Sequence, residues 1–341
     1  MSDEKNTFEN EEEDYQNYIK DSLNEVDGNS TYTNKSPSEI VHIGKKMARR
    51  TNIMVSLAIL LLIVPVMTLA SYLYYGIGGR ANHLIDVVTN TVYVTEPNMS
   101  LEKLELEDDI GFFTMNISFD VFKRIGKEDF KAGDYSIDFL LDQPDYPKRN
   151  MVLERPLPQI PSKDTAVMVH PGANPSFSSK DNWDILNKLP NGTVAEVYVS
   201  LGHVMKPEEL KKSLPKNMDL RWLAVDTGLE GKGVDAEGVP IAPLGYPAQP
   251  DSTTWSPFKD GDNEKVFLDI LSMLEKDEDI AQQVAPAKSL ALSTRLAYIK
   301  KNGIKVYGAV ITGPTEELRK LETMKEISEI KVGEVKLWNW E

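Results

Sequence analysis

The segment TNIMVSLAILLLIVPVMTLASYLYY, residues 51–75, decides the architecture of this 341-residue chain. It carries no charged side chain, and about 20 apolar residues in a helix are enough to cross the hydrocarbon core of a bilayer. A core helix of this length would show a polar face, and a signal peptide would not follow about fifty polar residues. We therefore predict a single transmembrane helix over 51–75. Its last turns carry Tyr72, Tyr74 and Tyr75, a residue type that favours the membrane interface.

Basic residues are concentrated on one side of this segment. Lys45, Lys46, Arg49 and Arg50 directly precede it, whereas Arg80 alone follows closely. Cytoplasmic flanks of membrane helices carry an excess of Lys and Arg. The four preceding residues are therefore our membrane-orienting candidates. They predict a single-pass protein of the cell membrane, with a cytoplasmic N-terminus and an extracellular C-terminal domain.

The N-terminal tail is short and acidic. Residues 1–44 hold eleven acidic side chains against three lysines, a net charge of −8. Its apolar side chains recur at spacings of three, four and seven, which places them on one stripe of a helix. Such a helix has nothing to pack on within the tail and is suited to a partner's groove. The composition fits a solvated, disordered tail equally well, so both interpretations stay open. The candidate partner-binding residues are Phe8, Tyr15, Tyr18, Ile19 and Leu23.

A helix start lies between this tail and the apolar segment. Ser36-Pro37-Ser38-Glu39 has the pattern of a capping box with proline at the first helical position. Nothing interrupts the chain from Pro37 to residue 51, so we predict one helix that begins at Pro37 and continues through the span.

The chain beyond the span divides at a proline-rich stretch. Residues 154–163 contain three prolines and predict a linker. Before it, apolar runs predict strands at Thr91–Thr95, Phe112–Phe122 and Tyr135–Leu141. We expect an α+β protein with four regions. These are a cytoplasmic acidic tail (1–50), the transmembrane helix (51–75), an extracytoplasmic β-rich region (76–160) and an extracytoplasmic α+β domain (161–341).

The last of these regions repeats one plan. VYVSL (197–201) precedes PEELKKS (207–213), and VYGAVITG (306–313) precedes PTEELRK (314–320). A proline early in a helix with acids in the first turn is a typical helix start. Two such β-α-β units predict a ferredoxin-like split β-α-β sandwich. The further predicted elements are strands over 193–201, 220–226, 304–312 and 329–340, and helices over 265–276 and 289–301.

Composition argues against several classes of function. The net charge is −15, whereas a protein that binds nucleic acid directly needs a basic footprint. The absence of cysteine excludes disulfides and thiolate metal sites, and the four histidines have no metal-ligand spacing. The motifs of serine hydrolases, P-loop nucleotidases and zinc proteases are missing. We assign no catalytic, cofactor or metal residue and expect no enzyme.

Several short strings fit one family. Their order and spacing resemble the membrane-bound anti-sigma factors of Gram-positive bacteria that regulate sigma-M-type extracytoplasmic-function sigma factors. The resemblance extends from Ser36 to Trp340. The strings are SYLYYG (71–76), LGYP (244–247), NGIKVYG (302–308), TGPT (312–315) and VGEVKLWNW (332–340).

The resemblance implies a role in signal transduction and transcription regulation. The tail would hold an extracytoplasmic-function sigma factor at the membrane, and the outer domain would act as a sensor of envelope stress. A small membrane protein is the co-regulator that the family suggests. An acidic helix is also suited to cover the basic DNA-binding surface of such a partner.

A second hypothesis belongs to another class. The chain would be a membrane-anchored extracellular module that binds a wall component or another ligand, with an inert tail and no role in transcription. Replacing Tyr15, Tyr18 and Ile19 by serine separates the two hypotheses, because only the first predicts altered transcription.

Overall fold

The computed structural model describes residues 37–157, 166–173, 179–235, 238–239, 241–251, 256–259, 261–286 and 289–340. The chain forms two compact units, Met1–Val66 and Met67–Glu341, and each is described by itself. The five tail candidates Phe8, Tyr15, Tyr18, Ile19 and Leu23, and the predicted capping residue Ser36, lie outside the described residues.

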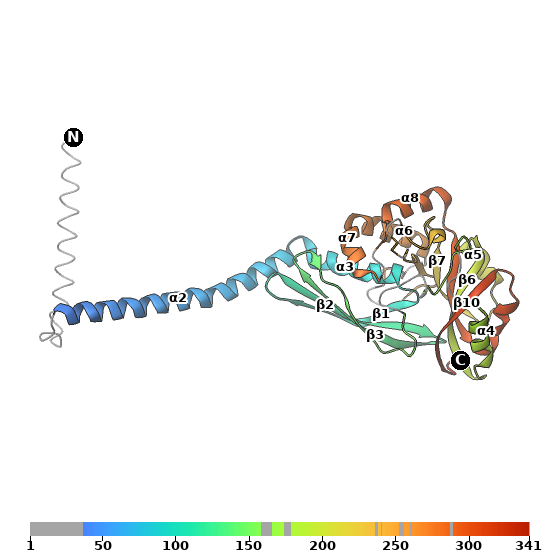
Figure 1. Ribbon diagram of the computed structural model, residues 1–341, viewed down its shortest axis with the longest axis horizontal. Helices are drawn as coiled ribbons and strands as arrows, with labels where there is room; N and C mark the ends of the chain where they lie inside the picture. Colours follow the sequence, from blue (N-terminus) through green and yellow to red (C-terminus); the bar gives the residue numbers. More distant parts are fainter. Residues whose placement is uncertain are drawn as a thin grey trace. The chain divides into compact units, whose positions relative to one another are not determined.

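The apolar segment lies in one long helix, α2 (Pro37–Gly76, Figure 1). The predicted start at Pro37 and the continuation through the span are confirmed, and Pro65 lies inside the helix. Its most apolar stretch has a mean hydropathy of 2.7, and no part of that stretch is buried by protein. Among the described residues this is the one helix with the length and composition to cross a membrane.

A second helix follows after a short turn. The 3-10 turn η1 (Ile77–Gly79) leads into α3 (Arg80–Thr95). The predicted strand Thr91–Thr95 is therefore wrong, because these residues form the last turns of α3. Periodicity cannot distinguish a strand from a helix where every side of the segment is buried, and here residues 91–95 are all buried. The Thr91 and Thr95 hydroxyls donate to the main-chain oxygens one turn earlier, at 2.7 and 2.6 Å, so neither hydroxyl is left unpaired.

The first sheet is antiparallel and is built mainly from three long strands. These are β1 (Met99–Ile110), β2 (Thr114–Ile125) and β3 (Glu128–Leu140), and the short β4 (Gln143–Pro144) and β5 (Lys148–Met151) both pair with β3. Buried and partly exposed residues alternate along β2, so one face of the sheet is covered. The predicted strands at 112–122 and 135–141 correspond to β2 and β3, whereas β1 had not been predicted.

The second sheet has the strand order β10-β6-β9-β7-β8, with every neighbouring pair antiparallel. The four predicted strands are confirmed to within a few residues as β6, β7, β9 and β10, whereas β8 had not been predicted. The bounds are β6 (Thr193–Met205), β7 (Asp219–Val225), β8 (Gly245–Pro247), β9 (Val306–Pro314) and β10 (Ile327–Leu337).

The predicted helix start at Pro207 and the predicted stop at Gly303 are confirmed, as the start of α5 and the end of α8. The helices predicted over 265–276 and 289–301 correspond to α6 and α8, whereas α4 and α7 had not been predicted. Asp262 caps α6 by accepting from the Lys265 N–H. The helix predicted after Pro314 is short, because its four α-helical residues continue as a 3-10 turn (Arg319–Thr323). The bounds are α4 (Ser179–Lys188), α5 (Pro207–Ser213), α6 (Asn263–Leu274), α7 (Glu278–Val284), α8 (Leu292–Asn302) and α9 (Thr315–Leu318). The chain is thus α+β with a single candidate membrane span.

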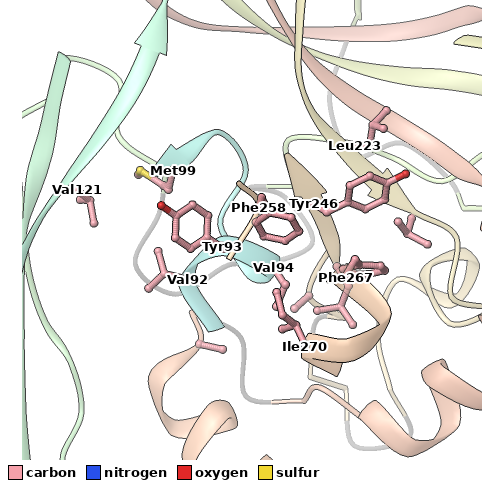
Figure 2. Close-up of a cluster of buried hydrophobic side chains, with 14 of the residues drawn as sticks. Val92, Tyr93, Val94, Met99, Val121, Leu223, Tyr246, Phe258, Phe267 and Ile270 are labelled. Carbon is pink, nitrogen blue, oxygen red and sulfur yellow. The ribbon is translucent and has the colours of Figure 1, made fainter. Parts of the chain in front are cut away.

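Helix α3 lies at the centre of the hydrophobic core. Figure 2 shows Tyr93 of α3 facing Phe258, with Phe267 and Ile270 of α6 beside Val94. The ring centroids of Tyr93 and Phe258 are 5.9 Å apart. The helix also contacts α7, β8 and β1, so it joins both sheets to the helical layer.

Candidate functional site

The four membrane-orienting residues lie in one short section of α2. Lys45, Lys46, Arg49 and Arg50 are all exposed, and their spacing places them on one side of the helix. None forms an ion pair with an acidic side chain in the described part of the chain. Exposed Lys and Arg beside an apolar helix attract anionic lipid headgroups.

The last turns of α2 are held by two turns of the first sheet. The Ser71 hydroxyl accepts the Phe113 N–H at 2.7 Å and donates to the Met67 oxygen. The Tyr75 hydroxyl lies 3.0 Å from both the Phe113 and the Leu141 oxygens. Ser71 and Tyr75 are fully buried. We call Ser71, Tyr75, Phe113 and Leu141 the helix clamp.

The backbone of the helix clamp is strained. Phe113 and Leu141 have φ angles of 53° and 60°, in the left-handed region that bulky residues rarely adopt. This conformation costs about 1–2 kcal/mol per residue, so the surrounding contacts must hold it. Tyr75 has one hydroxyl proton and two facing carbonyls, so it donates to one of them at a time. The helix clamp is therefore a place where a small movement of the sheet reaches α2.

The sequence predicted that Tyr75 lies at the membrane interface, but it did not predict the hydrogen bonds of Tyr75 to Phe113 and Leu141. No sequence signal marks Phe113 or Leu141, because positive φ is expected at Gly, Asn or Asp rather than at Phe or Leu.

A glycine pair joins α2 to the core. Gly78 and Gly79 have φ angles of 73° and 70°, and they turn the chain from α2 into α3. Helix α3 is then fixed by side-chain hydrogen bonds. Trp222 donates its indole N–H to the Tyr93 oxygen at 3.1 Å, and Tyr93 donates its hydroxyl to Asp251 at 2.8 Å. The three residues of η1 are all that separates α3 from α2 in the chain. A shift of the core around α3 therefore acts directly on the end of α2.

A buried ionic junction connects the two sheets. The Lys123 ammonium of β2 lies 3.0 Å from both carboxylate oxygens of Glu196 in β6, and both side chains are buried. Asn98 donates to the same carboxylate at 2.8 Å, and the Tyr198 hydroxyl, which accepts from Lys123, donates to it at 3.1 Å. Burial, and then the charge of Glu196, raise the pKa of Tyr198 well above its usual range, so Tyr198 stays a neutral donor.

A second polar cluster surrounds Asp226, the buried residue that directly follows β7. Asp226 accepts from the Tyr298 hydroxyl at 3.0 Å and the Gly228 N–H at 3.1 Å, and the His170 ring lies 3.5 Å away. Burial by itself would raise the pKa of Asp226, but these three groups outweigh it and the pKa is lowered. Within the described ranges, no three His, Asp or Glu side chains come together in an arrangement that could hold a metal ion.

Comparison with known proteins identifies relatives along most of the chain. Residues 38–130 match the family described as sigma factor regulator N-terminal, and residues 186–334 match sigma factor regulator C-terminal. The chain is 30% identical over 353 residues to the probable anti-sigma-M factor YhdL of Bacillus subtilis (strain 168). That alignment covers 100% of this chain and 95% of the relative. No solved structure matches the chain.

Proposed function

The chain belongs to the sigma factor regulator family of anti-sigma factors, and we propose that it holds an extracytoplasmic-function sigma factor inactive at the membrane and releases it on envelope stress. The observation that carries this proposal is the full-length match to a probable anti-sigma-M factor, which includes the apolar helix. The family implies a regulatory rather than an enzymatic role.

The topology that we propose has the tail in the cytoplasm and the globular unit outside. Lys45, Lys46, Arg49 and Arg50 support this orientation, because all four are exposed on the N-terminal side of the apolar stretch. Residues 1–50 are then the sigma-binding tail, 51–75 the span, 76–160 the β-rich region and 161–341 the sensor. A small membrane protein as co-regulator remains part of the proposal.

We also propose a ferredoxin-like fold for the C-terminal part. Strands β6, β7, β9 and β10 follow one another in the chain as strands one to four of two β-α-β units. Their order in the sheet, β10-β6-β9-β7, interleaves the two units as a split β-α-β sandwich does. The long connection from β7 to β9 contains β8 and the helices α6, α7 and α8.

A conformational route from sensor to tail is compatible with these contacts. A ligand or a stress that shifts the sheets acts on α3 and on the helix clamp, and both lead into α2. Because α2 runs from Pro37 to Gly76, the tail begins directly at its other end. A strained, partly buried contact with two possible acceptors is the kind of element that switches between two states.

Co-purification of the full-length chain with co-expressed sigma factors tests the proposal. We expect one sigma factor to be retained in detergent and its reporter to be silent. The triple variant Tyr15→Ser, Tyr18→Ser, Ile19→Ser should lose the partner and activate the reporter. The matched control carries Asn10→Ser, Asn17→Ser and Asn24→Ser, which would lie on the opposite side of such a helix, and should behave as the wild type.

Two outcomes would contradict the proposal. If no sigma factor is retained and deletion of the gene leaves every sigma-dependent regulon silent, the chain is not an anti-sigma factor. If the wild type binds a sigma factor but the stripe and control variants behave alike, the assignment of the binding residues in the tail is wrong, whereas the anti-sigma role is still supported.

A further inference from the structure

Two turns of the first sheet expose large apolar side chains. Phe112, in the turn between β1 and β2, is 52% exposed. Leu140 and Leu141, at the end of β3 and in the turn that follows, are 61% and 37% exposed. Single exposed apolar residues are normal, but a contiguous group of them marks an interaction surface. We call these three the tip residues.

The tip residues lie at the level of the last turns of α2. Phe113 and Leu141 bond to Ser71 and Tyr75 through their main chains, and the rings of Phe113 and Tyr74 are 6.4 Å apart. Ser71, Tyr74 and Tyr75 of α2 lie near the C-terminal end of the uncharged stretch of residues 51–79. The depth of the tip residues is therefore set by hydrogen bonds to the end of the apolar helix.

Apolar side chains in the last turns of α2 and in η1 add exposed apolar area at the same end of the helix. Tyr72, Leu73 and Ile77 each expose at least half of their area. Charged groups border it: Arg80 stacks on the Tyr74 ring at 4.5 Å and donates to the Tyr74 oxygen, and exposed Asp142 follows Leu141. Aromatic rings and snorkelling cations are typical of the headgroup layer, and an exposed carboxylate opposes deeper entry.

We propose that the two turns insert into the interfacial layer of the lipid bilayer, so that the globular unit rests on the membrane through Phe112, Leu140 and Leu141. Lipid is the occupant because both turns are hydrogen-bonded to the end of a helix that has the length and composition to span the bilayer. The inference goes beyond the proposed function, since it does not depend on which protein the tail binds.

This contact gives the membrane access to the helix clamp. Leu141 is a tip residue, and Phe113 directly follows the tip residue Phe112. The main-chain oxygens of Phe113 and Leu141 are also the acceptors for the Tyr75 hydroxyl. A change in headgroup packing that lifts or sinks the two turns therefore moves the carbonyls that hold the end of α2.

Site-specific labelling tests the insertion. The chain has no cysteine, so a single introduced cysteine is the only thiol. Phe112→Cys and Leu140→Cys carry the test label, an environment-sensitive fluorophore. Tyr72→Cys is the lipid-facing control and Leu337→Cys, on a residue 83% exposed at the end of β10, is the water-facing control. Each full-length variant is reconstituted in phosphatidylcholine vesicles, with and without lipids that carry a nitroxide near the headgroup.

We expect the nitroxide lipids to quench labels 72, 112 and 140 several-fold more than label 337, and iodide in the buffer to quench label 337 most. Adding Phe112→Glu to the Leu140→Cys chain should lower lipid quenching and raise iodide quenching at 140. The inference is overturned if iodide reaches 112 and 140 as readily as 337. It is equally overturned if neither quencher reaches them, which indicates a protein cover such as a second copy. Failure of lipid quenching at 72 refutes the span together with the insertion.

Discussion

The Lys123 side chain is fully buried at the junction of the sheets. Its partner Glu196 is also buried, so water cannot take the place of the Lys123 ammonium group if that group is removed. We predict that Lys123→Ala lowers the free energy of unfolding by about 3–5 kcal/mol, because it leaves a buried carboxylate unpaired. Urea unfolding of the full-length chain in detergent, followed by tryptophan fluorescence, measures the change.

Two further variants separate this effect from the loss of a side chain in general. Lys148→Ala removes an ion pair with Asp138 in which the lysine is 75% exposed, so stability should hardly change. The double variant Lys123→Met, Glu196→Gln should recover a large part of the loss, since neither member of the pair is then charged. Equal costs for Lys123→Ala and Lys148→Ala would refute the importance of the junction.

Asp226 gives a prediction with a defined pH dependence. Its folded-state pKa is lowered, so the charged carboxylate contributes stability that is present above the unfolded pKa of about 3.9. This contribution is lost as the pH falls through the folded pKa. Asp226→Asn should therefore destabilise the protein at pH 7, and the difference from the wild type should shrink below about pH 4.

Chemical denaturation at the two pH values measures this difference. Asp262→Asn is a suitable control, because that residue caps α6 with one side-chain hydrogen bond of 3.2 Å. A difference between Asp226→Asn and the wild type that grows on acidification would contradict the assigned direction.

At the scale of elements, the turn between α2 and α3 depends on two glycines with positive φ. Gly79 has a φ of 70° and no atom within 4 Å of an added Cβ, so only backbone strain opposes a side chain there. We predict that Gly79→Ala costs about 1–2 kcal/mol. Gly76→Ala is the matched control, because it also meets open space but has no positive φ, and it should be neutral or slightly stabilising. Thermal unfolding of both variants in detergent measures the contrast; similar costs would refute the strain.

The helix clamp gives a second prediction at this scale. Tyr75→Phe removes the hydroxyl that faces Phe113 and Leu141, a net loss of about 0.5–1.5 kcal/mol. The Leu141 N–H, which donates to the Phe113 oxygen at 2.8 Å, should then exchange its hydrogen up to about ten times faster. Hydrogen exchange with mass spectrometry detects this in peptides that cover the two turns. Tyr72→Phe, at an exposed position of the same helix, should leave the exchange unchanged.

How far the sequence predicts these elements depends on whether a pattern has one meaning. The uncharged run 51–75 has one meaning, and α2 was predicted with its start at Pro37. The run Thr91–Thr95 has two meanings, since β-branched residues are found in strands and also in a helix that is buried on all sides. Here tertiary packing around the segment favours the helix. The helix clamp had no pattern at all. It depends on positive φ at Phe113 and Leu141, which arises from tertiary contacts rather than from residue type.

At the scale of the whole molecule, charge is distributed unevenly along the chain. The net charge is −15, and residues 1–44 contribute −8 of it, directly before the basic residues of α2. Acidic side chains contribute little to membrane orientation, whereas nearby Lys and Arg dominate it. The orientation of the whole protein should therefore depend on four side chains out of 341.

We predict that the combined substitution of Lys45, Lys46, Arg49 and Arg50 by glutamine yields a mixed orientation in the cell membrane. Single cysteines report it in intact cells with a thiol reagent that does not cross membranes. In the wild-type background, Asn302→Cys should be labelled and Ser30→Cys protected. In the quadruple variant, part of Ser30→Cys should become labelled, because the signal that retains the N-terminal flank in the cytoplasm is gone.

The control for this experiment changes the same amount of charge elsewhere. Glutamine at Lys211, Lys212, Lys300 and Lys301, far from the span in sequence, should leave the orientation as in the wild type, since only residues near the ends of a membrane helix set it. If the quadruple α2 variant keeps Ser30→Cys fully protected, the orientation is set by another feature, such as export of the large domain. If Ser30→Cys is labelled already in the wild-type background, the tail is extracellular and cannot bind a sigma factor, so this one measurement also decides whether the proposed function is possible.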